Sequence, residues 1–524
     1  MALLDLDWRF LLPRRGELPR RALLLGAPPA LVSELEGAGI ASELLVRPGA
    51  PADLVVCLAA AGVTPDAAAA YLAPGGVLYH ERTFPRTSMP RTLSLLGVYW
   101  VHPRFTGERS YVPLDVDGAL AWYLATIGAP RTAGAELTRR AVAAFGSKRF
   151  ARVAPRIALV AIDRRADRER PTIFRGAATP PAVGEDGVRP LLLAHGGELS
   201  RAVLLPFTPH SRRPVAVVKL HRTEVPDETT AYESATLIEI RRRLTPELQA
   251  TVPEPLGPTE VAGRPAAVEG FLDGEWLLSR WARRRSNPEL VEDLERVTTW
   301  LSAFHTQTTM ERRPWSAADV ERRIERPIAA YREWFATTPA EEALFAHLSD
   351  LARAAIGADL PVVWQHGDLS SLNVILAADR VGVIDWRNAG TGLPLDDLLY
   401  FVTRWLYRVR GAEDESPAER AVAASAFDEL FFGVDANDAA VTAARESLLD
   451  YVRALELDPR VVTLVFAHAW IARAVGRHTQ RTRDGERSDD PRAGNRYVTL
   501  VERVAAQRAR LARGFPWTDQ ADGS

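Results

Sequence analysis

The sequence is poor in cysteine, in lysine and in long apolar runs. Its single cysteine, Cys57, lies within an apolar stretch, so we expect a buried small side chain rather than a disulfide partner or a nucleophile. No run of about 18 uncharged apolar residues occurs, as a membrane-spanning helix would need. The first residues also lack the basic and apolar regions of a signal peptide. These absences predict a cytoplasmic protein without integral membrane association.

The sequence also lacks an excess of either positive or negative charge. The chain has 65 basic and 67 acidic side chains, which give a formal net charge of -2. Such a balance provides no overall field that would attract nucleic acid or an anionic membrane. We therefore expect a small molecule as the partner and no nucleic acid. The oligomeric state does not follow from the sequence.

Lysine is rare enough that its positions carry information. Only Lys148 and Lys219 occur, and the other 63 basic residues are arginine. A chain that uses arginine for its surface cations keeps a lysine where a planar guanidinium does not fit, as at a crowded phosphate site. Lys148 stands beside Arg149 in a polar stretch, and we interpret it as chance retention. Lys219 ends the apolar, strand-like run 215–218, which favours a functional role.

What the chain does contain is the composition of a globular protein with several cores. Apolar residues make up 47% and charged residues 25% of the 524 positions. A typical domain has about 100 to 200 residues, so the length predicts roughly three folding units.

The pattern of apolar runs predicts a multidomain α/β and α+β fold. Residues 1–165 alternate strand-like and helical stretches, which favours a Rossmann-like parallel sheet. A densely charged run then predicts a linker at 166–187. Strands separated by turns over 188–272 predict a small β-rich lobe, and helical periodicity over 273–515 predicts a larger helical lobe. Residues 516–524 are expected to be a tail.

A strand, loop and strand pattern at 362–385 carries the most informative polar residues. Asp368 and Asn373 lie in the loop, and Asp385 ends the second strand. This layout can bring the three side chains to one edge of a short hairpin. Phosphoryl transfer needs oxygen ligands for Mg²⁺ and a carboxylate at the attacking hydroxyl, and these side chains supply both.

The same stretch resembles a known family. His366-Gly367-Asp368 followed by Asn373 matches the H-x-D-x-x-x-x-N loop of the aminoglycoside phosphotransferase and choline kinase family. Ile384-Asp385-Trp386 is similar to that family's magnesium-binding element, and residues 392–398 are similar to its G-x-P-x-x-D-L stretch. The resemblance extends over roughly residues 185–515. It implies a bilobal phosphotransferase fold like that of protein kinases.

By position, the resemblance assigns roles to the loop residues. Asp368 would be the catalytic base, and Asn373 and Asp385 would bind Mg²⁺. His366 would be a structural member of the loop rather than a proton carrier. Asp397 would hold the loop by hydrogen bonds, with a substrate-facing role as the alternative. The implied cofactors are ATP or GTP, together with Mg²⁺.

The resemblance also implies a phosphate-binding lysine. Lys219 would face the α- and β-phosphates of the nucleotide and pair with Glu233 on the next helix. Glu239 is a second candidate for that partner, and a solvated glutamate on a helix face is the alternative for Glu233.

Two further segments would complete the nucleotide site. Gly196, Gly197 and Ser200 would form the loop that covers the phosphates, because glycines let backbone amides approach phosphate oxygens closely. A plain hairpin turn is the alternative for this loop. Main-chain groups near Glu269 and Phe271 would bind adenine.

Residues 1–165 resemble class I methyltransferases that use S-adenosylmethionine (SAM). The likeness rests on the strand-like runs 22–26 and 53–58 and on the turn and strand at 71–79. In place of the glycine-rich loop of that family, residues 26–30 contain two prolines, which remove backbone donors. We therefore expect a degenerate domain that neither methylates nor binds SAM. Its role would be acceptor recognition, partner docking or packing.

Together these residues predict ATP-dependent transfer of the γ-phosphate to a hydroxyl group of a small polar acceptor, such as a sugar, an amino alcohol or a glycan end. A bifunctional kinase and methyltransferase is one alternative, and a catalytically silent kinase-like scaffold is another. Retention of the lysine and of the three loop residues argues against the scaffold. We expect acceptor specificity near 310–345 and 468–478, but the sequence does not identify the acceptor.

Overall fold

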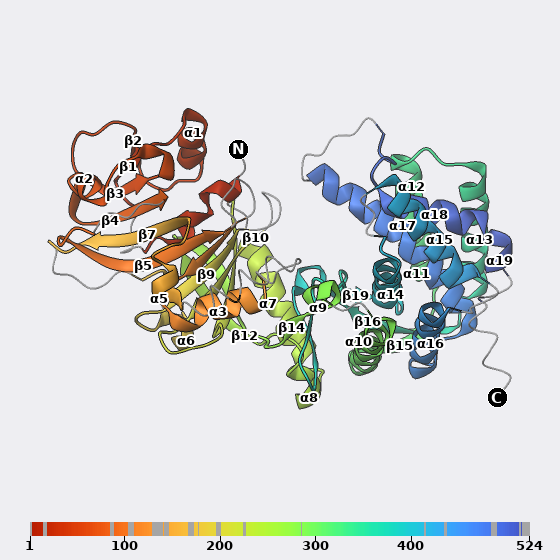
Figure 1. Cartoon of the computed structure of the whole chain (residues 1–524). Helices are drawn as coiled ribbons and strands as arrows, with labels where there is room; N and C mark the ends of the chain where they lie inside the picture. Colours follow the sequence, from red (N-terminus) through yellow and green to blue (C-terminus); the bar gives the residue numbers. More distant parts are fainter. Residues whose placement is uncertain are drawn as a thin grey trace. The chain divides into compact units, whose positions relative to one another are not determined.

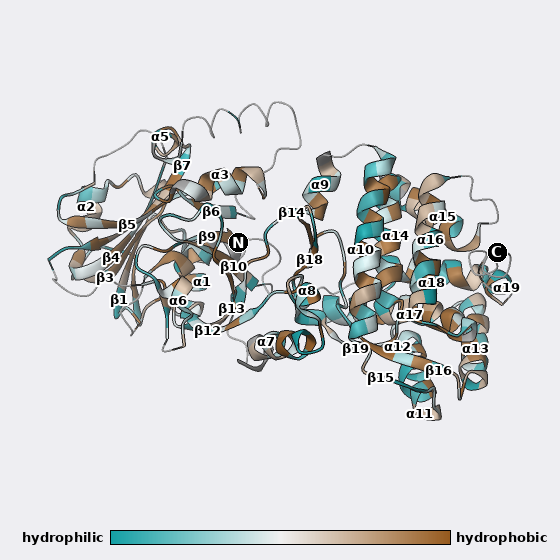
Figure 2. Cartoon of the chain, turned by 90° about the horizontal axis from the view of Figure 1, so that it is seen from below, coloured by the Kyte–Doolittle hydropathy of each residue, from teal (hydrophilic) through white to brown (hydrophobic). Residues whose placement is uncertain are grey.

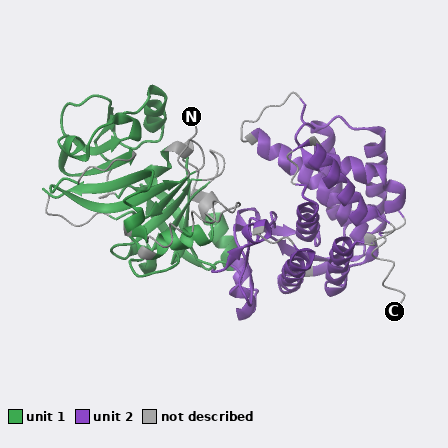
Figure 3. Ribbon diagram, in the orientation of Figure 1, with its two compact units in different colours: residues 1–238, 253–272 green, residues 239–252, 273–524 purple. Residues whose placement is uncertain are grey.

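A computed structural model divides the chain into two compact units (Figures 1 and 3). Unit 1 comprises residues 1–238 and 253–272, and unit 2 comprises residues 239–252 and 273–524. The residues that the structure describes are 3–13, 18–83, 89–102, 109–127, 140, 146–165, 172–176, 178–194, 201–223, 227–283, 286–412, 416–433, 438–483, 490–512 and 515.

Among the residues described, unit 1 is built on one mixed β-sheet of 13 strands. Their order across the sheet is β2-β1-β3-β4-β7-β5-β6-β9-β10-β11-β13-β12-β8. The strands are β1 (Arg21–Leu25), β2 (Glu43–Leu45), β3 (Ala52–Cys57), β4 (Leu72–Thr83), β5 (Leu93–His102), β6 (Arg109–Pro113), β7 (Arg156–Asp163), β8 (Phe174–Arg175), β9 (Arg189–Ala194), β10 (Arg201–Phe207), β11 (Ala216–His221), β12 (Pro255–Val261) and β13 (Arg264–Gly270).

Short helices connect and cover these strands. They are η1 (Leu3–Leu11), α1 (Pro29–Gly37), η2 (Ala59–Ala61), α2 (Pro65–Ala69), α3 (Asp117–Ala125), α5 (Ser147–Phe150), α6 (Pro181–Gly184) and α7 (Asp227–Arg241). Figure 2 shows the strands of the N-terminal part largely in the hydrophobic colour. Cys57, at the end of β3, is buried and unpaired, as expected from its apolar neighbours.

Parallel pairing among the described strands is confined to the N-terminal four. β1 pairs in parallel with β2 and β3, and β3 pairs in parallel with β4. β7 then pairs antiparallel with both β4 and β5, and β6 pairs antiparallel with β5. The connection 103–108 between β5 and β6 is too short for the crossover helix that a parallel neighbour needs. The Rossmann-like domain expected for residues 1–165 is therefore not established by this arrangement.

The sheet continues without a break from the N-terminal strands into the expected β-rich lobe. β6 pairs antiparallel with β9, with Arg109 opposite Ala194 and Tyr111 opposite Leu192. Part of the expected linker also belongs to the sheet, because β8 pairs with the edge strand β12. Residues 1–165 and most of 188–272, expected as separate domains, thus lie in one compact unit, whereas residues 239–252 belong to unit 2. Apolar runs predict strands but not which distant strands pair, so the sequence pattern gave no sign of this ladder.

The N-terminal helix η1 anchors the start of the chain to this unit. The Trp8 ring stacks on Tyr79, with 4.5 Å between ring centroids. Arg222, just after β11, donates a hydrogen bond of 2.7 Å to Asp7, and both side chains are fully buried. Arg9 donates a hydrogen bond of 2.7 Å to the Arg222 carbonyl oxygen. Buried charges must be paired to be tolerated, so η1 and the end of β11 depend on each other.

Unit 2 is mainly helical. Its longer helices are α10 (Asn287–Gln307), α12 (Arg326–Trp334), α13 (Pro339–Ala354), α14 (Asp396–Val409), α15 (Pro417–Phe432), α16 (Ala439–Ala454), α17 (Pro459–Arg483) and α18 (Arg496–Ala506), and its shorter ones are α8 (Pro246–Gln249), α9 (Leu277–Arg283), α11 (Ala317–Val320), η3 (Glu321–Glu325), η4 (Trp386–Asn388) and α19 (Arg508–Leu511). Within the described ranges, none of the helices combines the length and apolar character that crossing a membrane requires.

Two small sheets interrupt the helices of unit 2. One contains β14 (Glu275–Trp276), β17 (Val374–Leu376) and β18 (Val381–Val383), and the other contains β15 (Glu311–Pro314), β16 (Asp359–Gln365) and β19 (Gly390–Gly392). β17 and β18 form a hairpin, with Val374 opposite Val383. The strands expected around the polar loop at 362–385 are thus present, with the loop between β16 and β17.

Candidate active site

A buried cluster of ion pairs in unit 1 surrounds Lys219. The Lys219 Nζ atom on β11 lies 2.8 Å from Glu233 Oε1 on α7 and 2.8 Å from Glu269 Oε2 on β13. Arg201, at the start of β10, binds the second carboxylate oxygen of Glu233. Glu269 lies opposite Val217 in the ladder between β11 and β13, two positions from Lys219. The two side chains are therefore diagonal neighbours on one face of the sheet.

The environment gives the two glutamates opposite electrostatic character. Burial acts to raise the pKa of Glu233, but the charges of Lys219 and Arg201 outweigh it and lower the pKa to about 2. Burial raises the pKa of Glu269 to about 7, with Lys219 opposing the shift and Glu233 adding to it. Lys219 therefore has one firmly ionised partner and one carboxylate that titrates close to neutral pH.

The structure distinguishes between the two glutamates on α7 that are candidates for the partner of Lys219. Glu233 contacts Lys219, whereas Glu239 pairs with Arg243 on the same helix at 2.7 Å. Six residues on a helix are about 240° of rotation, so the two side chains point in different directions.

Main-chain groups near Glu269 and Phe271 are expected to bind adenine, and the side chains of these two residues contact other residues of unit 1. The Glu269 side chain joins the lysine cluster, and sequence reasoning missed this contact because it crosses between strands that are far apart in the chain. The Phe271 ring lies 5.8 Å from the ring of Trp122, centroid to centroid. Gly196, Gly197 and Ser200 lie outside the described residues, immediately before Arg201.

In unit 2, the backbone of the loop after β16 is held by one carboxylate. The amides of His366 and Gly367 donate hydrogen bonds of 2.6 and 2.9 Å to the two oxygens of Asp397. Gly367 has a φ of +79°, and a Cβ atom there would lie 2.5 Å from the Asn388 carbonyl oxygen. Only glycine fits this position without displacement of the neighbouring backbone.

His366 braces the same loop. Its Nε2 atom lies 2.8 Å from the carbonyl oxygen of Ile384, and its ring packs against Trp386 with centroids 4.8 Å apart. The side chain is fully buried. The geometry fits the structural role that the sequence predicted for it.

Asp397 is positioned by strained backbone and by a histidine. It lies in the first turn of α14, directly after Leu395 and Asp396, and Leu395 has a φ of +73°. His305 Nε2 on α10 lies 3.7 Å from Asp397 Oδ2, and both side chains are fully buried. Burial acts to raise the pKa of Asp397, but the nearby side chains of His305 and His366 outweigh it and bring the pKa below its usual value. Asp397 is thus an ionised group inside the protein.

Asn373 contacts Asp368 just before the β17–β18 hairpin, and Asp385 follows the end of that hairpin. The Asn373 Nδ2 atom donates a hydrogen bond of 2.9 Å to the Asp368 carbonyl oxygen and lies 3.5 Å from Asp368 Oδ2. The Ile384 amide donates a hydrogen bond of 2.9 Å to the Asn373 carbonyl oxygen, so Asp385 follows directly beside it. Asp385 has a φ of +65°, a conformation that aspartate tolerates better than most residues.

A large cavity lies beside Asp368. It has a volume of about 1290 Å³ and is lined by Gly367, Asp368 and Ser370 of the loop and by residues of α14, α17 and α18. Burial raises the pKa of Asp368 above its usual value; His366 and Arg473 oppose the shift, and Asp385 adds to it. A carboxylate with a raised pKa at the wall of a cavity is a candidate for proton transfer.

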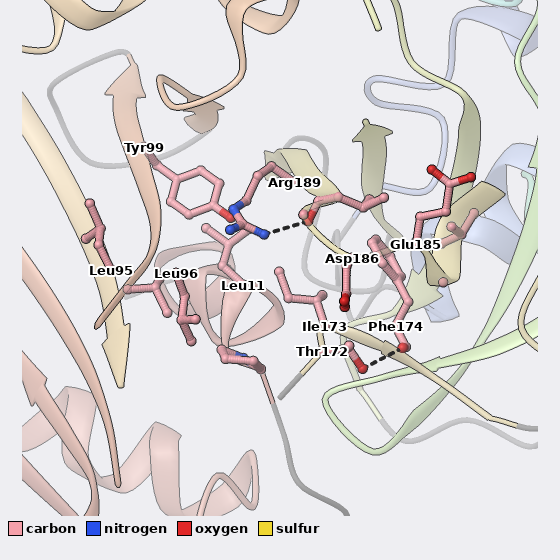
Figure 4. Close-up of a pocket in the computed structure, with 16 residues that line it drawn as sticks. Leu11, Leu95, Leu96, Tyr99, Thr172, Ile173, Phe174, Glu185, Asp186 and Arg189 are labelled. Atoms are coloured by element: carbon pink, nitrogen blue, oxygen red, sulfur yellow. Dashed lines mark hydrogen bonds between the residues drawn. The ribbon is translucent and has the colours of Figure 1, made fainter. Parts of the chain in front are cut away.

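A second cavity lies in unit 1 (Figure 4). Its described lining residues include none of the Lys219 cluster and none of the loop after β16. It measures about 100 Å³ and is lined by Leu11, Tyr99 and Arg189, among others. Arg189 donates hydrogen bonds to the Val188 carbonyl oxygen and to Asp115. This volume is below the roughly 300 Å³ of the smaller ligand pockets, so we assign no ligand to it.

We expect Asp397→Asn to destabilise the fold by about 2 kcal/mol, because the amide removes a buried charged acceptor from two backbone donors. The folded-state pKa of Asp397 lies below its usual value, so the ionised form stabilises the fold above about pH 4, and this contribution is lost as the pH falls further. The difference in unfolding free energy between wild type and variant, measured by urea denaturation, should therefore shrink in acid. Asp379→Asn, in the exposed turn between β17 and β18, is the control. A difference that does not change with pH would contradict the role of the charge.

One part of the chain, which contains both groups of residues described above, matches a known protein family. Residues 195–433 match the model of a family described as the phosphotransferase enzyme family. The matched segment contains the lysine cluster and the loop residues, and it is somewhat less than half of the chain. No curated protein matches the sequence.

The solved structures that match the chain include sugar kinases, amino alcohol kinases and aminoglycoside phosphotransferases. A glucosamine kinase in complex with glucosamine, ADP and inorganic phosphate is 17% identical, covers 63% of this chain and 81% of its own, and has a TM-score of 0.37. A choline kinase from Cryptosporidium parvum Iowa II is 10% identical, with coverages of 62% and 92% and a TM-score of 0.37. A choline/ethanolamine kinase family protein from Mesorhizobium loti is 13% identical, with coverages of 64% and 95% and a TM-score of 0.35.

These TM-scores are too low to support an argument about function, and the family match is the stronger finding. The match confirms the expected resemblance for residues 195–433 and does not extend to the segment expected to be methyltransferase-like. Residues 195–433 are therefore similar to a family of phosphotransferase enzymes.

Proposed function

We propose that the chain transfers the γ-phosphate of ATP or GTP to a hydroxyl group of a small polar acceptor. The observation that carries the proposal is the position of Asp368, a half-buried carboxylate at the wall of a large cavity and next to Asn373. The family match over residues 195–433 supports the type of reaction.

In this proposal Asp368 receives the proton of the acceptor hydroxyl. The acceptor oxygen forms a bond to the γ-phosphorus, the bond from that phosphorus to the bridging oxygen breaks, and the nucleoside diphosphate leaves. A raised pKa suits Asp368 to this role, because a base works best when its pKa approaches the working pH. His366 and Asp397 would keep the loop backbone in place.

Asn373 and Asp385 would hold Mg²⁺. The Asn373 amide nitrogen is bonded to the loop backbone, which leaves its Oδ1 atom as the ligand. Mg²⁺ is commonly held by one or two protein oxygens together with substrate phosphates, so a larger cluster is not required, and the described residues contain no group of three or more potential ligands among His, Cys, Asp and Glu. The ion would neutralise charge on the phosphates.

Lys219 would contact the nucleotide phosphates, with Glu233 fixing its position. The direct ion pair between the two side chains supports this role. For Gly196, Gly197 and Ser200 we propose the phosphate-covering loop, and for the main chain near Glu269 and Phe271 the adenine contacts.

We further propose that the N-terminal part is a degenerate methyltransferase-like domain that does not bind SAM. Gly26, in the turn after β1, has a φ of +75°, and a Cβ atom there would lie 2.6 Å from the backbone nitrogen of Ala61. The η2 segment thus packs against the turn in which a cofactor loop would stand. Pro28 and Pro29 remove two backbone donors from the same turn.

We expect Asp368→Asn to lower the rate of phosphoryl transfer by about 10²- to 10⁴-fold, because asparagine keeps the size but cannot accept the proton. The assay would supply ATP and Mg²⁺ to the full chain with a small-molecule extract and follow metabolites that gain the mass of a phosphate. Asp379→Asn is the matched control. An undiminished rate in the Asp368 variant would contradict the assignment, and no transfer by the wild type would favour the silent scaffold.

Lys219→Arg tests the phosphate contact. A bulky planar guanidinium should fit poorly between Glu233 and Glu269, so we expect the KM for ATP to rise by about tenfold or more. Lys148→Arg, which changes the chain's other lysine, is the control and should leave KM unchanged. If both variants behave like the wild type, Lys219 does not contact the nucleotide.

Calorimetric titration of the full chain with SAM tests the N-terminal assignment. We expect no heat of binding at SAM concentrations up to about 1 mM, a range that covers weak specific ligands. An ATP analogue serves as the positive control for the same sample. Saturable SAM binding would instead favour the bifunctional kinase and methyltransferase.

A further inference from the structure

The cavity beside Asp368 is strongly basic. Six arginines line it, and Asp368 and Asp396 are its only carboxylates among the lining residues described. The arginines are Arg387, Arg420, Arg473, Arg477, Arg492 and Arg496. They come from the segment after β18, from α15, from α17, from the segment 490–495 and from the start of α18, so the charge does not arise from a single sequence run.

Three of these arginines are neutralised by neighbouring carboxylates. Arg473 binds Asp396 and lies 4.1 Å from the centroid of the Tyr400 ring. Arg492 lies 2.8 Å from Glu341 and also binds Glu502. Arg387 is 3.6 Å from Asp385. These contacts place the three guanidinium groups but leave the cavity with further positive charge.

Arg420 and Arg477 are different. Both are exposed at the wall of the cavity, and neither has a carboxylate within ion-pair distance in the described part of the chain. A pair of arginines that face a cavity without internal partners can bind an anion without first losing an ion pair.

A tyrosine in the same wall responds to the positive charge. Burial acts to raise the pKa of Tyr497, but the guanidinium groups of Arg496 and Arg473 outweigh it and bring the pKa below its usual value. Arg496 also donates a hydrogen bond of 3.1 Å to the Tyr497 hydroxyl oxygen. The field in this part of the cavity therefore favours negative charge.

Such a lining disfavours a cationic acceptor. An ammonium group placed in the cavity would meet several guanidinium groups of like charge, and like-charge contacts are costly where water is partly excluded. Phosphate and carboxylate groups suit guanidinium geometry, because the planar fork can donate two parallel hydrogen bonds to them.

We propose that the acceptor is an anionic hydroxylated small molecule, such as a phosphorylated or carboxylated sugar, and that Arg420 and Arg477 bind its acidic group. The inference rests on the proposed phosphotransferase function and specifies its substrate class. The acceptor's hydroxyl would point to Asp368, and its acidic group would lie towards α15 and α17.

Binding of matched sugars to the full chain tests the inference. Glucose 6-phosphate and glucuronate supply the two kinds of acidic group, glucose is the neutral analogue and glucosamine the cationic one. Titrations are made with AMP-PNP and Mg²⁺ at saturating concentration, so that occupancy of the nucleotide site does not mimic acceptor binding. We expect an anionic sugar to bind more tightly than glucose, and glucosamine to bind most weakly.

Arg420→Gln and Arg477→Gln, combined in one variant, should weaken binding of the anionic sugar by about tenfold or more, as expected for loss of charge-assisted hydrogen bonds. Arg453→Gln, an exposed change on α16 outside the cavity, is the matched control and should have no effect. Unchanged circular dichroism and AMP-PNP affinity establish that the variant is folded.

The inference is overturned if neither anionic sugar binds, if glucosamine binds at least as tightly as they do, or if the double variant retains wild-type affinity. None of these results depends on turnover. Loss of transfer in Asp368→Asn tests the reaction, so failure of the acceptor class and failure of the phosphotransferase proposal give different results.

Discussion

The antiparallel pairing of β6 with β9 is the constraint on which unit 1 depends. It joins the N-terminal strands to the strands that carry the lysine cluster, and the ladder runs on through β10 to β11 and β13. Lys219 and Glu269 therefore face each other because strand register places them there, and Glu233 and Arg201 complete the cluster from α7 and β10. The buried contact of Asp7 with Arg222 fixes the end of β11 from the N-terminal side. A side chain proposed to bind nucleotide is thus positioned by residues from both halves of one sheet.

In unit 2, Asp397 is the residue on which the position of the proposed site depends. A single buried carboxylate binds two successive amides of the loop after β16 and approaches His305, so the loop backbone, the first turn of α14 and α10 are coupled through one charge. Asp368 lies in this loop but contributes none of these bonds through its carboxylate. Asp397 thus holds the loop, while Asp368 is the residue proposed to take the proton. Because Asp368 is not needed to hold the loop, its carboxylate can line the cavity.

Sequence reasoning succeeded where chemistry and local structure coincide. His366, Asp368, Asn373 and Asp385 lie within 20 positions, and a hairpin brings such neighbours together whatever the rest of the fold does. The Lys219–Glu233 contact was also predicted, but from the family resemblance, which pairs the strand lysine with a glutamate on the next helix. Glu269 was missed as a side-chain partner, since only the register of β11 against β13 reveals it. The arginines of the cavity come from segments far apart in the chain. The segment 468–478, expected to govern specificity, supplies Arg473 and Arg477, whereas no lining residue among those described comes from 310–345.

The continuous sheet also limits how this gene can be rearranged. Residues 1–165 resemble a separate domain in the sequence, and recombination can usually add, remove or exchange such a domain. Here a cut near residue 165 would leave β6 and β9 as two unpaired edges, each with a row of open backbone donors and acceptors that favours aggregation. A descendant could lose the N-terminal segment only if another strand took its place beside β9. The strands of the N-terminal segment are therefore needed for folding of the strands that follow, whatever chemistry that segment has.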